Sequence, residues 1–162
     1  ACKILVFDNL LDKLSIKEVE AIVCHELGHW KHRHVLKQTL IILGEILLVI
    51  KMFLYILKDD SFFVSFGFNK NKFPDGLYLC FLVFYLPISE FMQGIKYKIY
   101  RKFEYQADQF AFEMGYGKHL KTALIKISEN NLTHPEAFGT HPSLYQRISF
   151  LNSLHDYEQD DL

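Results

Sequence analysis

The chain has 162 residues, of which half are apolar and 23% are charged, and its net charge is −1. This length is enough for one domain with a core, and the small net charge gives no electrostatic reason to expect nucleic acid as a partner. Three scattered cysteines without a CxxC pair argue against a disulfide framework and against a thiolate zinc site.

The amino-terminal part of the chain predicts a short strand followed by a capped helix. Residues 3–7 are mostly aliphatic or aromatic and precede a turn-prone Asp-Asn pair, as expected for a strand. Ser15 and Glu18 have the spacing of a capping box, in which each side chain hydrogen-bonds an unpaired amide of the first turn. Apolar residues then recur at helical spacing, which predicts a helix from about Ile16 to beyond Trp30.

Two long apolar runs predict membrane spans. Residues 35–57 form the first run, and at ~1.5 Å per residue a helix of this length spans the ~30 Å hydrocarbon core of a bilayer. A second run at about 77–96 contains Pro87, which we expect to kink it. The polar residues 58–76 between the runs predict a loop. A long buried helix of a soluble protein is the competing interpretation of the first run.

The rest of the chain predicts three more helices. They are a basic amphipathic helix from near Lys96 to Gly115 or Gly117, a second amphipathic helix at about 120–130, and a final helix at about 144–154. We expect the acidic tail, residues 156–162, to be solvated or frayed. The predicted fold is therefore mainly α, with two transmembrane helices and at most a short strand.

An HExxH motif lies within the first predicted helix, at residues 25–29. Residues four apart lie on the same helix face. His25 and His29 therefore point toward one metal ion, while Glu26 stands beside its open coordination position. We predict a single Zn²⁺ at this motif, with Glu26 as the general base.

A catalytic zinc site needs a third protein ligand. The residues after His29 do not continue as xxGxxH, so the ligand is expected from a later helix. Glu104 and Asp108 form an ExxxD pair on one helix face. We predict, for a gluzincin-like pair of active-site helices, that Glu104 binds the zinc and Asp108 accepts a hydrogen bond from a ligand imidazole. The remaining histidines, including His32 and His34, are interpreted as surface or packing residues.

The two predicted spans return the chain to the side from which it started, so His29 and Glu104 lie on one side of the membrane. Basic residues flank the site there, whereas acidic residues offset the lysines of the opposite loop. The positive-inside rule therefore places the zinc face in the cytoplasm or nucleoplasm. The flanking basic residues are Lys31, Arg33, Lys37, Lys96, Lys98, Arg101 and Lys102.

Three blocks of the sequence resemble one known family, the CAAX prenyl endopeptidases, which are multi-span zinc proteases of the endoplasmic reticulum and inner nuclear membranes. The blocks are Val23–Trp30, Arg101–Asp108, and Thr140–Leu144 with Arg147, in the order and spacing of the family. Where the family usually has a second proline, this chain has Ser143. Members also have several spans before the strand, so we expect residues 1–162 to be a single catalytic peptidase domain fragment.

The resemblance implies a zinc metalloendopeptidase that cuts near the carboxyl terminus of farnesylated CAAX proteins, in contact with membrane lipid. It also implies that His141 is catalytic, as a donor to the oxyanion that develops at the scissile carbonyl. Arg147 pairs either with Asp108 or with the carboxylate of the substrate. Three polar residues of the apolar runs either line a wet chamber or pair among neighbouring helices: Gln38, Glu45 and Glu90.

Two other functions remain open. A membrane quality-control metalloprotease of the heat-shock type shares the HExxH and ExxxD patterns, although Trp30 and the block at 140–144 argue against it. A non-catalytic fragment that keeps zinc as a structural element is the second alternative. Glu26 argues against that alternative, because a structural site has no use for a base beside an open position.

Overall fold

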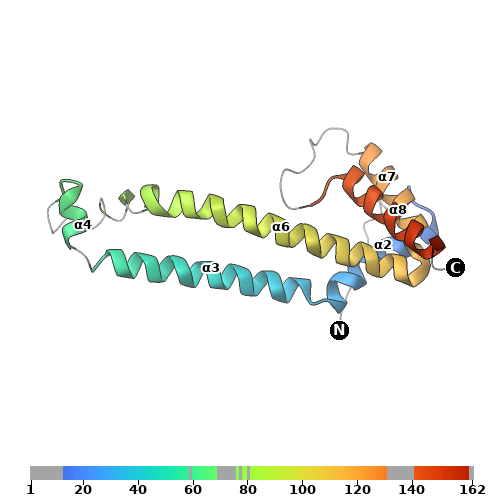
Figure 1. The fold of residues 1–162 in the computed structure, drawn as a ribbon, viewed down its shortest axis with the longest axis horizontal. Coiled ribbons are helices and arrows are strands. Elements are labelled where there is room, and N and C mark those ends of the chain that lie inside the picture. Colours follow the sequence, from blue (N-terminus) through green and yellow to red (C-terminus); the bar gives the residue numbers. More distant parts are fainter. Residues whose placement is uncertain are drawn as a thin grey trace. The chain divides into compact units, whose positions relative to one another are not determined.

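The computed structural model describes residues 13–58, 60–68, 76, 78–79, 81–130 and 141–160. These residues form helices and no strand, which confirms the predicted mainly α fold (Figure 1). The predicted strand at 3–7 lies outside the described residues. The elements are α2 (Ile16–Lys31), α3 (His34–Ile56), α4 (Asp60–Ser65), the π-helical η1 (Phe81–Tyr85), α6 (Leu86–Ala111), the π-helical η2 (Phe112–Tyr116), α7 (Gly117–Asn130) and α8 (Leu144–Asp160).

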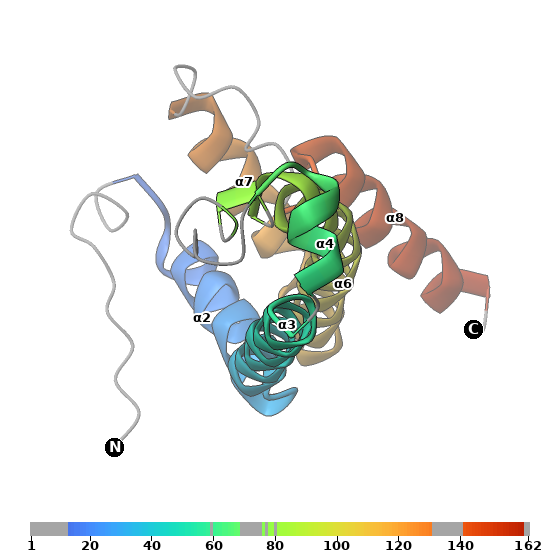
Figure 2. The same ribbon diagram turned by 90° about the vertical axis from the view of Figure 1, so that its left-hand side faces the viewer.

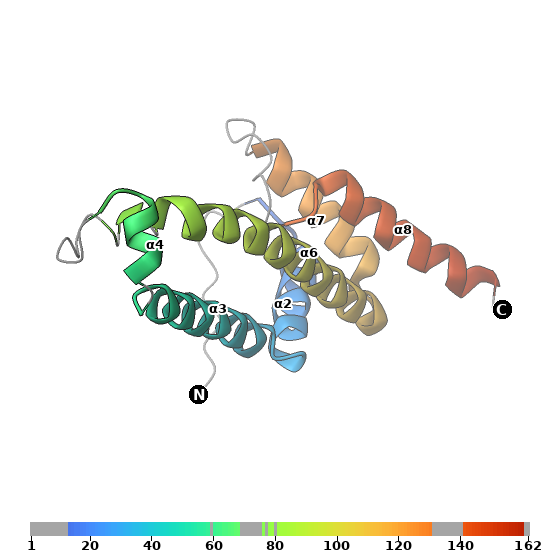
Figure 3. The same ribbon diagram turned by 60° about the vertical axis from the view of Figure 1, so that its left-hand side comes forward.

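The chain divides into two compact units, and the unit that contains the HExxH motif comprises residues 1–35 and 97–162. Within it, α2 packs against η2 and α7, and α7 packs against α8. Figure 1 and Figure 3 both show α7 and α8 side by side. The core of this unit contains Ala21, Ala111, Leu120 and Leu151.

The predicted capping box begins α2 as expected. The backbone amide of Ser15 donates to Oε2 of Glu18 at 2.7 Å, and the amide of Glu18 donates to Oγ of Ser15 at 3.4 Å. The helix ends at Lys31, and the next helix begins only three residues later because Arg33 adopts a left-handed conformation with φ 53°. A side chain that is not glycine adopts this conformation rarely. This tight connection brings the start of α3 back toward the end of α2.

A glycine lets α2 approach α6 closely. A Cβ atom added at Gly28 would lie 2.9 Å from Cα of Ala107, so any larger residue there must push the two helices apart. Both residues are buried. The HExxH motif and the ExxxD pair are therefore held face to face by direct backbone packing.

The second unit comprises residues 36–96. Most of α3 belongs to it, and this helix of 23 residues has a mean hydropathy of 2.3 over its most apolar 18-residue window, none of which is buried. By length and composition α3 could cross a membrane, in agreement with the predicted span at 35–57. No other helix among the described residues passes the same test, so the second span, at 77–96, stays a prediction.

An ion pair joins the two long helices within this second unit. Nζ of Lys96, in α6, lies 2.6 Å from Oε2 of Glu45, in α3, and both side chains are largely buried. Figure 2, which looks along α3, shows α6 beside it. Of the two predictions for Glu45, pairing with a neighbouring helix is therefore the one that the structure confirms.

Some predicted boundaries were wrong. The segment 58–76 contains the short helix α4, and not a loop alone. The interruption expected at Pro87 is present as η1, the π-helical turn directly before it, because proline lacks the N–H that would bond back into that turn. Consequently α6 already begins at Leu86. The tail is also more ordered than expected, since α8 continues to Asp160.

Candidate metal centre

The three predicted metal ligands meet at one point. Nε2 of His25 lies 3.1 Å from Nε2 of His29. Oε2 of Glu104 lies 3.6 Å from Nε2 of His25, and Oε1 of Glu104 lies 3.5 Å from Nε2 of His29. Two ligand atoms about 2.0–2.1 Å from a tetrahedral zinc ion are ~3.3 Å apart, so the spacing fits zinc. Within the part of the chain that the structure describes, these residues form the one cluster able to hold a metal.

His25 is oriented by a buried carboxylate. Its Nδ1 lies 2.9 Å from Oδ1 of Asp108, whose side chain is fully buried. A carboxylate accepts, so Nδ1 of His25 carries the proton and Nε2 keeps its lone pair for a metal. That lone pair faces the Glu104 carboxylate, and two such electron-rich groups are held together most favourably by a cation. The predicted hydrogen bond between Asp108 and a ligand imidazole is present in the structure.

Arg147 holds Asp108 in place from α8. Its Nε lies 2.8 Å from Oδ2 of Asp108 and its Nη2 lies 2.5 Å from Oδ1, which is a bidentate pair. Although burial alone raises the pKa of Asp108, hydrogen bonds from His25 and Arg147 hold that pKa below its ordinary value. Of the two partners predicted for Arg147, the structure shows Asp108.

A capping box that was not predicted positions Arg147. The amide of Gln146 donates to Oγ of Ser143 at 3.2 Å, and the amide of Ser143 donates to Oε1 of Gln146 at 3.0 Å. Ser143 thus accepts a hydrogen bond from an amide in the first turn of α8 that has no partner within the helix. This is the position at which the sequence departs from the resembled family, and the serine gives the helix a cap.

His29 is held on its outer side by a third histidine. Burial, followed by the neighbouring His25, lowers the pKa of His29, which favours the neutral imidazole that binds metal. Its Nδ1 lies 2.9 Å from Nδ1 of His34. His34 is 1% exposed and stacks on Phe103 with ring centroids 4.3 Å apart. It packs, as predicted, but its bond to His29 was missed, because no motif links residues on either side of a helix end.

The two residues predicted to act on the substrate are accessible. Glu26 is exposed on α2 between the two ligand histidines. His141 has a side chain that is 60% exposed, and its Nδ1 lies 3.2 Å from Oε1 of Glu104. Both side chains are therefore accessible to a substrate.

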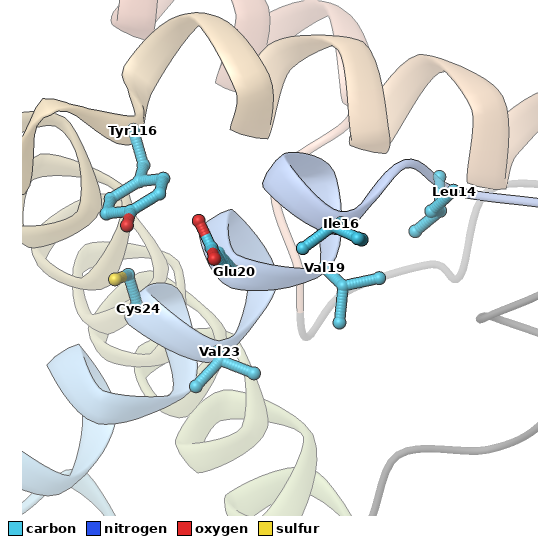
Figure 4. Close-up of a pocket in the computed structure, with 7 residues that line it drawn as sticks. All are labelled: Leu14, Ile16, Val19, Glu20, Val23, Cys24 and Tyr116. Carbon is cyan, nitrogen blue, oxygen red and sulfur yellow. The ribbon is translucent and has the colours of Figure 1, made fainter.

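The described residues also form an apolar pocket, of about 410 Å³, on a different face of α2. Figure 4 shows its lining, which includes Glu20 and Tyr116 but none of the metal-site residues. The hydrogen bond to Glu20 raises the pKa of Tyr116. Size alone would make this pocket a candidate, but the grouped metal ligands favour the other face.

Comparison with known proteins identifies peptidases that are similar to this chain. The sequence model of the family described as "Peptidase family M48" matches residues 1–155. The chain is 28% identical to CAAX prenyl protease 1 of Saccharomyces cerevisiae, over 98% of this chain and 40% of that protein. It is 33% identical to the CAAX prenyl protease 1 homolog of Homo sapiens, over 85% of this chain and 31% of that protein.

A solved structure has the same fold. The crystal structure of S. mikatae Ste24p matches with a TM-score of 0.71 and 30% sequence identity, over 90% of this chain and 38% of that one. The chain thus spans between three and four tenths of the length of these relatives.

Proposed function

This chain belongs to peptidase family M48, and from that premise we propose that it carries the zinc centre of a membrane metalloendopeptidase that cleaves the carboxyl-terminal region of prenylated CAAX proteins. The observation that carries the proposal is the convergence of His25, His29 and Glu104 at distances that suit zinc. The names of the similar proteins, CAAX prenyl protease 1, support the substrate class. The apolar α3 supports a membrane setting.

Each residue of the site has a separate role in the proposed hydrolysis of a peptide bond. His25, His29 and Glu104 would hold the zinc, which when bound supplies the Lewis acidity that activates water and polarises a carbonyl. Glu26 accepts a proton as the water oxygen bonds to the carbonyl carbon, and then delivers that proton to the amine as the C–N bond breaks. His141 donates a hydrogen bond to the oxygen on which negative charge develops.

Asp108 and Arg147 act through His25. The ionised Asp108 fixes the proton of His25 on Nδ1, and Arg147 keeps that carboxylate charged and oriented. We place the protein in the endoplasmic reticulum and inner nuclear membranes, with lipid around the apolar helices and the zinc face toward the cytoplasm or nucleoplasm. The basic residues around the site support this orientation.

The test is cleavage of a farnesylated CAAX peptide by membranes that contain the complete protein. Glu26→Gln should lower kcat by about a hundredfold or more, because it removes the base and leaves the ligands in place. Glu113→Gln is the matched control, since Glu113 is exposed on η2 and pairs with Gln109; it should cleave at the wild-type rate. A zinc chelator should abolish cleavage, and the unprenylated peptide should be cut poorly.

Two results would count against the proposal. If zinc-loaded protein leaves the farnesylated peptide intact but degrades a misfolded membrane protein, the quality-control function replaces it. If Glu26→Gln cleaves as fast as Glu113→Gln, the assigned base is wrong.

A further inference from the structure

His34 is a buried histidine for which the mechanism above has no role. It is the first residue of α3, and its ring lies between Phe103 and His32, with interplanar angles of 11° and 16°. Its Nδ1 lies 2.9 Å from Nδ1 of His29, and its Nε2 lies 3.0 Å from Oε1 of Gln106. A line of hydrogen bonds thus runs from a metal ligand to the amide side chain of Gln106.

The positions of the protons along this line follow from the chemistry of its end. The side-chain oxygen of Gln106 only accepts hydrogen bonds, so Nε2 of His34 carries a proton. Nδ1 of the neutral His34 ring then has a lone pair and accepts from Nδ1–H of His29. His29 is left with its lone pair on Nε2, the atom that faces His25 and Glu104.

The opposite arrangement would prevent metal binding. If the NH₂ group of Gln106 faced His34, Nε2 of His34 would have to accept, and the proton of His34 would lie on Nδ1. Nδ1 of His29 would then have to accept a hydrogen bond from Nδ1–H of His34. Nε2 of His29 would then carry a proton and could not bind a metal. With its oxygen toward His34, as the structure has it, Gln106 therefore favours the tautomer of His29 that can bind a metal.

We propose that His34 and Gln106 are positioning residues that fix the tautomer and orientation of His29 as a metal ligand. They do for His29 what Asp108 and Arg147 do for His25, but with neutral groups in place of an ion pair. The left-handed Arg33 makes this possible, because the tight connection returns His34 to the end of α2. The inference rests on the proposed function in one respect, which is that His29 holds a metal.

The test measures zinc affinity by competition with a chelator, using the complete protein in detergent. His34→Phe keeps the stacked ring on Phe103 but removes the acceptor, and it should weaken zinc binding by about 10–100-fold. His34→Asn places a carbonyl oxygen near the position of Nδ1 and should restore most of that affinity. The matched control is His32→Phe, which alters the adjacent ring of the stack, and its affinity should stay within about threefold of the wild type.

A second pair of variants keeps the test informative if His34→Phe does not fold. Gln106→Glu retains an oxygen acceptor for His34 and should bind zinc nearly as tightly as the wild type, whereas Gln106→Leu removes the acceptor and should bind it more weakly. Equal zinc affinities for these two variants, or wild-type affinity in a folded His34→Phe protein, would overturn the inference. Absence of zinc binding by the wild type would instead overturn the proposed metal site itself.

Discussion

Asp108 and Arg147 form an ion pair beneath the candidate metal ligands. The carboxylate of Asp108 is fully buried, and the side chain of Arg147 is 12% exposed. A buried charge that loses its partner is costly, because water no longer solvates it. The two residues are therefore expected to matter for folding even in the absence of metal.

Arg147→Ala should lower the free energy of unfolding of the metal-free protein by about 3–5 kcal/mol, since it leaves Asp108 buried without its ion-pair partner. Chemical denaturation in detergent measures this difference. Adding Asp108→Asn to Arg147→Ala should recover part of the loss, because the uncompensated charge is gone. Lys118→Ala, which removes an exposed positive charge, is the control. If Arg147→Ala unfolds at the same denaturant concentration as Lys118→Ala, the pair does not stabilise the fold.

The sequence allowed some of these residue contacts to be predicted and not others. His25, His29, Glu104 and Asp108 were found because helical spacing places each pair on one face, and the structure brings all four together. The contact of His34 with His29 could not be found in this way. It depends on the conformation of the residue before it, and nothing in the identity of an arginine predicts a left-handed backbone.

The packing of α2 on α6 depends on Gly28. An added Cβ would lie 2.9 Å from Cα of Ala107 and 3.2 Å from its carbonyl oxygen, and neither backbone atom can rotate away. Gly28→Ala should therefore destabilise the protein by about 1–3 kcal/mol and weaken zinc binding, because it separates the two helices that hold the ligands. Thermal unfolding and chelator competition measure the two effects.

Gly94→Ala is the matched control for Gly28→Ala. It makes the same change inside α6, where an added Cβ meets nothing within 4 Å. Its higher helix propensity should leave stability unchanged or raise it by up to ~1 kcal/mol. Equal effects of the two substitutions would show that the close approach of α2 and α6 is not needed for stability or for the site.

The capping box of α2 also ties this helix to α7. Nζ of Lys126 lies 2.8 Å from the Glu18 carboxylate, and this bond, with those from Ser15, lowers the pKa of Glu18 from 4.5 to about 2. The ionised form is thus favoured in the folded state. The ionised Glu18 carboxylate therefore stabilises the folded state fully above about pH 4.5, and this stabilisation is lost as the pH falls through 2.

Glu18→Gln should therefore be less stable than the wild type at pH 6, and the difference should shrink as the pH falls from 4.5 toward 2. Thermal unfolding of metal-free protein at several pH values measures this, with exposed Glu113→Gln as the control for removing a carboxylate. A difference that stays constant between pH 6 and pH 2.5 would contradict the lowered pKa of Glu18.

The helices were more predictable in their existence than in their ends. Capping residues and apolar periodicity gave α2 within a residue or two. The end of the helix before Gly117 was less certain, because Gly115 adopts φ 83° inside the π-helical η2 and the chain nonetheless continues as α7. Glycine permits such a conformation without requiring it. The presence of Gly115 and Gly117 therefore predicts an irregularity near these residues, but not the residue at which the helix ends.

For the whole molecule, the path of the chain between His29 and Glu104 determines whether these two ligands lie on the same side of a membrane. His29 precedes α3 and Glu104 follows the predicted second span. If α3 crosses the membrane, the chain must cross again before Glu104 for the two ligands to meet. The structure describes α3 as a helix long and apolar enough to cross, and the meeting of the ligands favours a return crossing within about 77–96.

Accessibility of single cysteines tests this topology. The native cysteines, Cys2, Cys24 and Cys80, are first replaced by serine, and a cysteine is then placed at Lys17, Lys118 or Phe66, all of them exposed. In sealed microsomes, whose cytoplasmic face is outward, an impermeant thiol reagent should label positions 17 and 118 at once. Position 66, between the spans, should be labelled after detergent opens the vesicles, because the bilayer blocks a charged reagent.

The pattern of labelling separates the possible arrangements. Labelling of all three positions before detergent would mean that α3 does not cross, and it would favour the interpretation of α3 as a helix packed within protein. Labelling of position 17 but not 118 would mean a single crossing, which is incompatible with one metal bound by His29 and Glu104. Only protection of position 66 alone agrees with both the apolar length of α3 and the distances at the metal site.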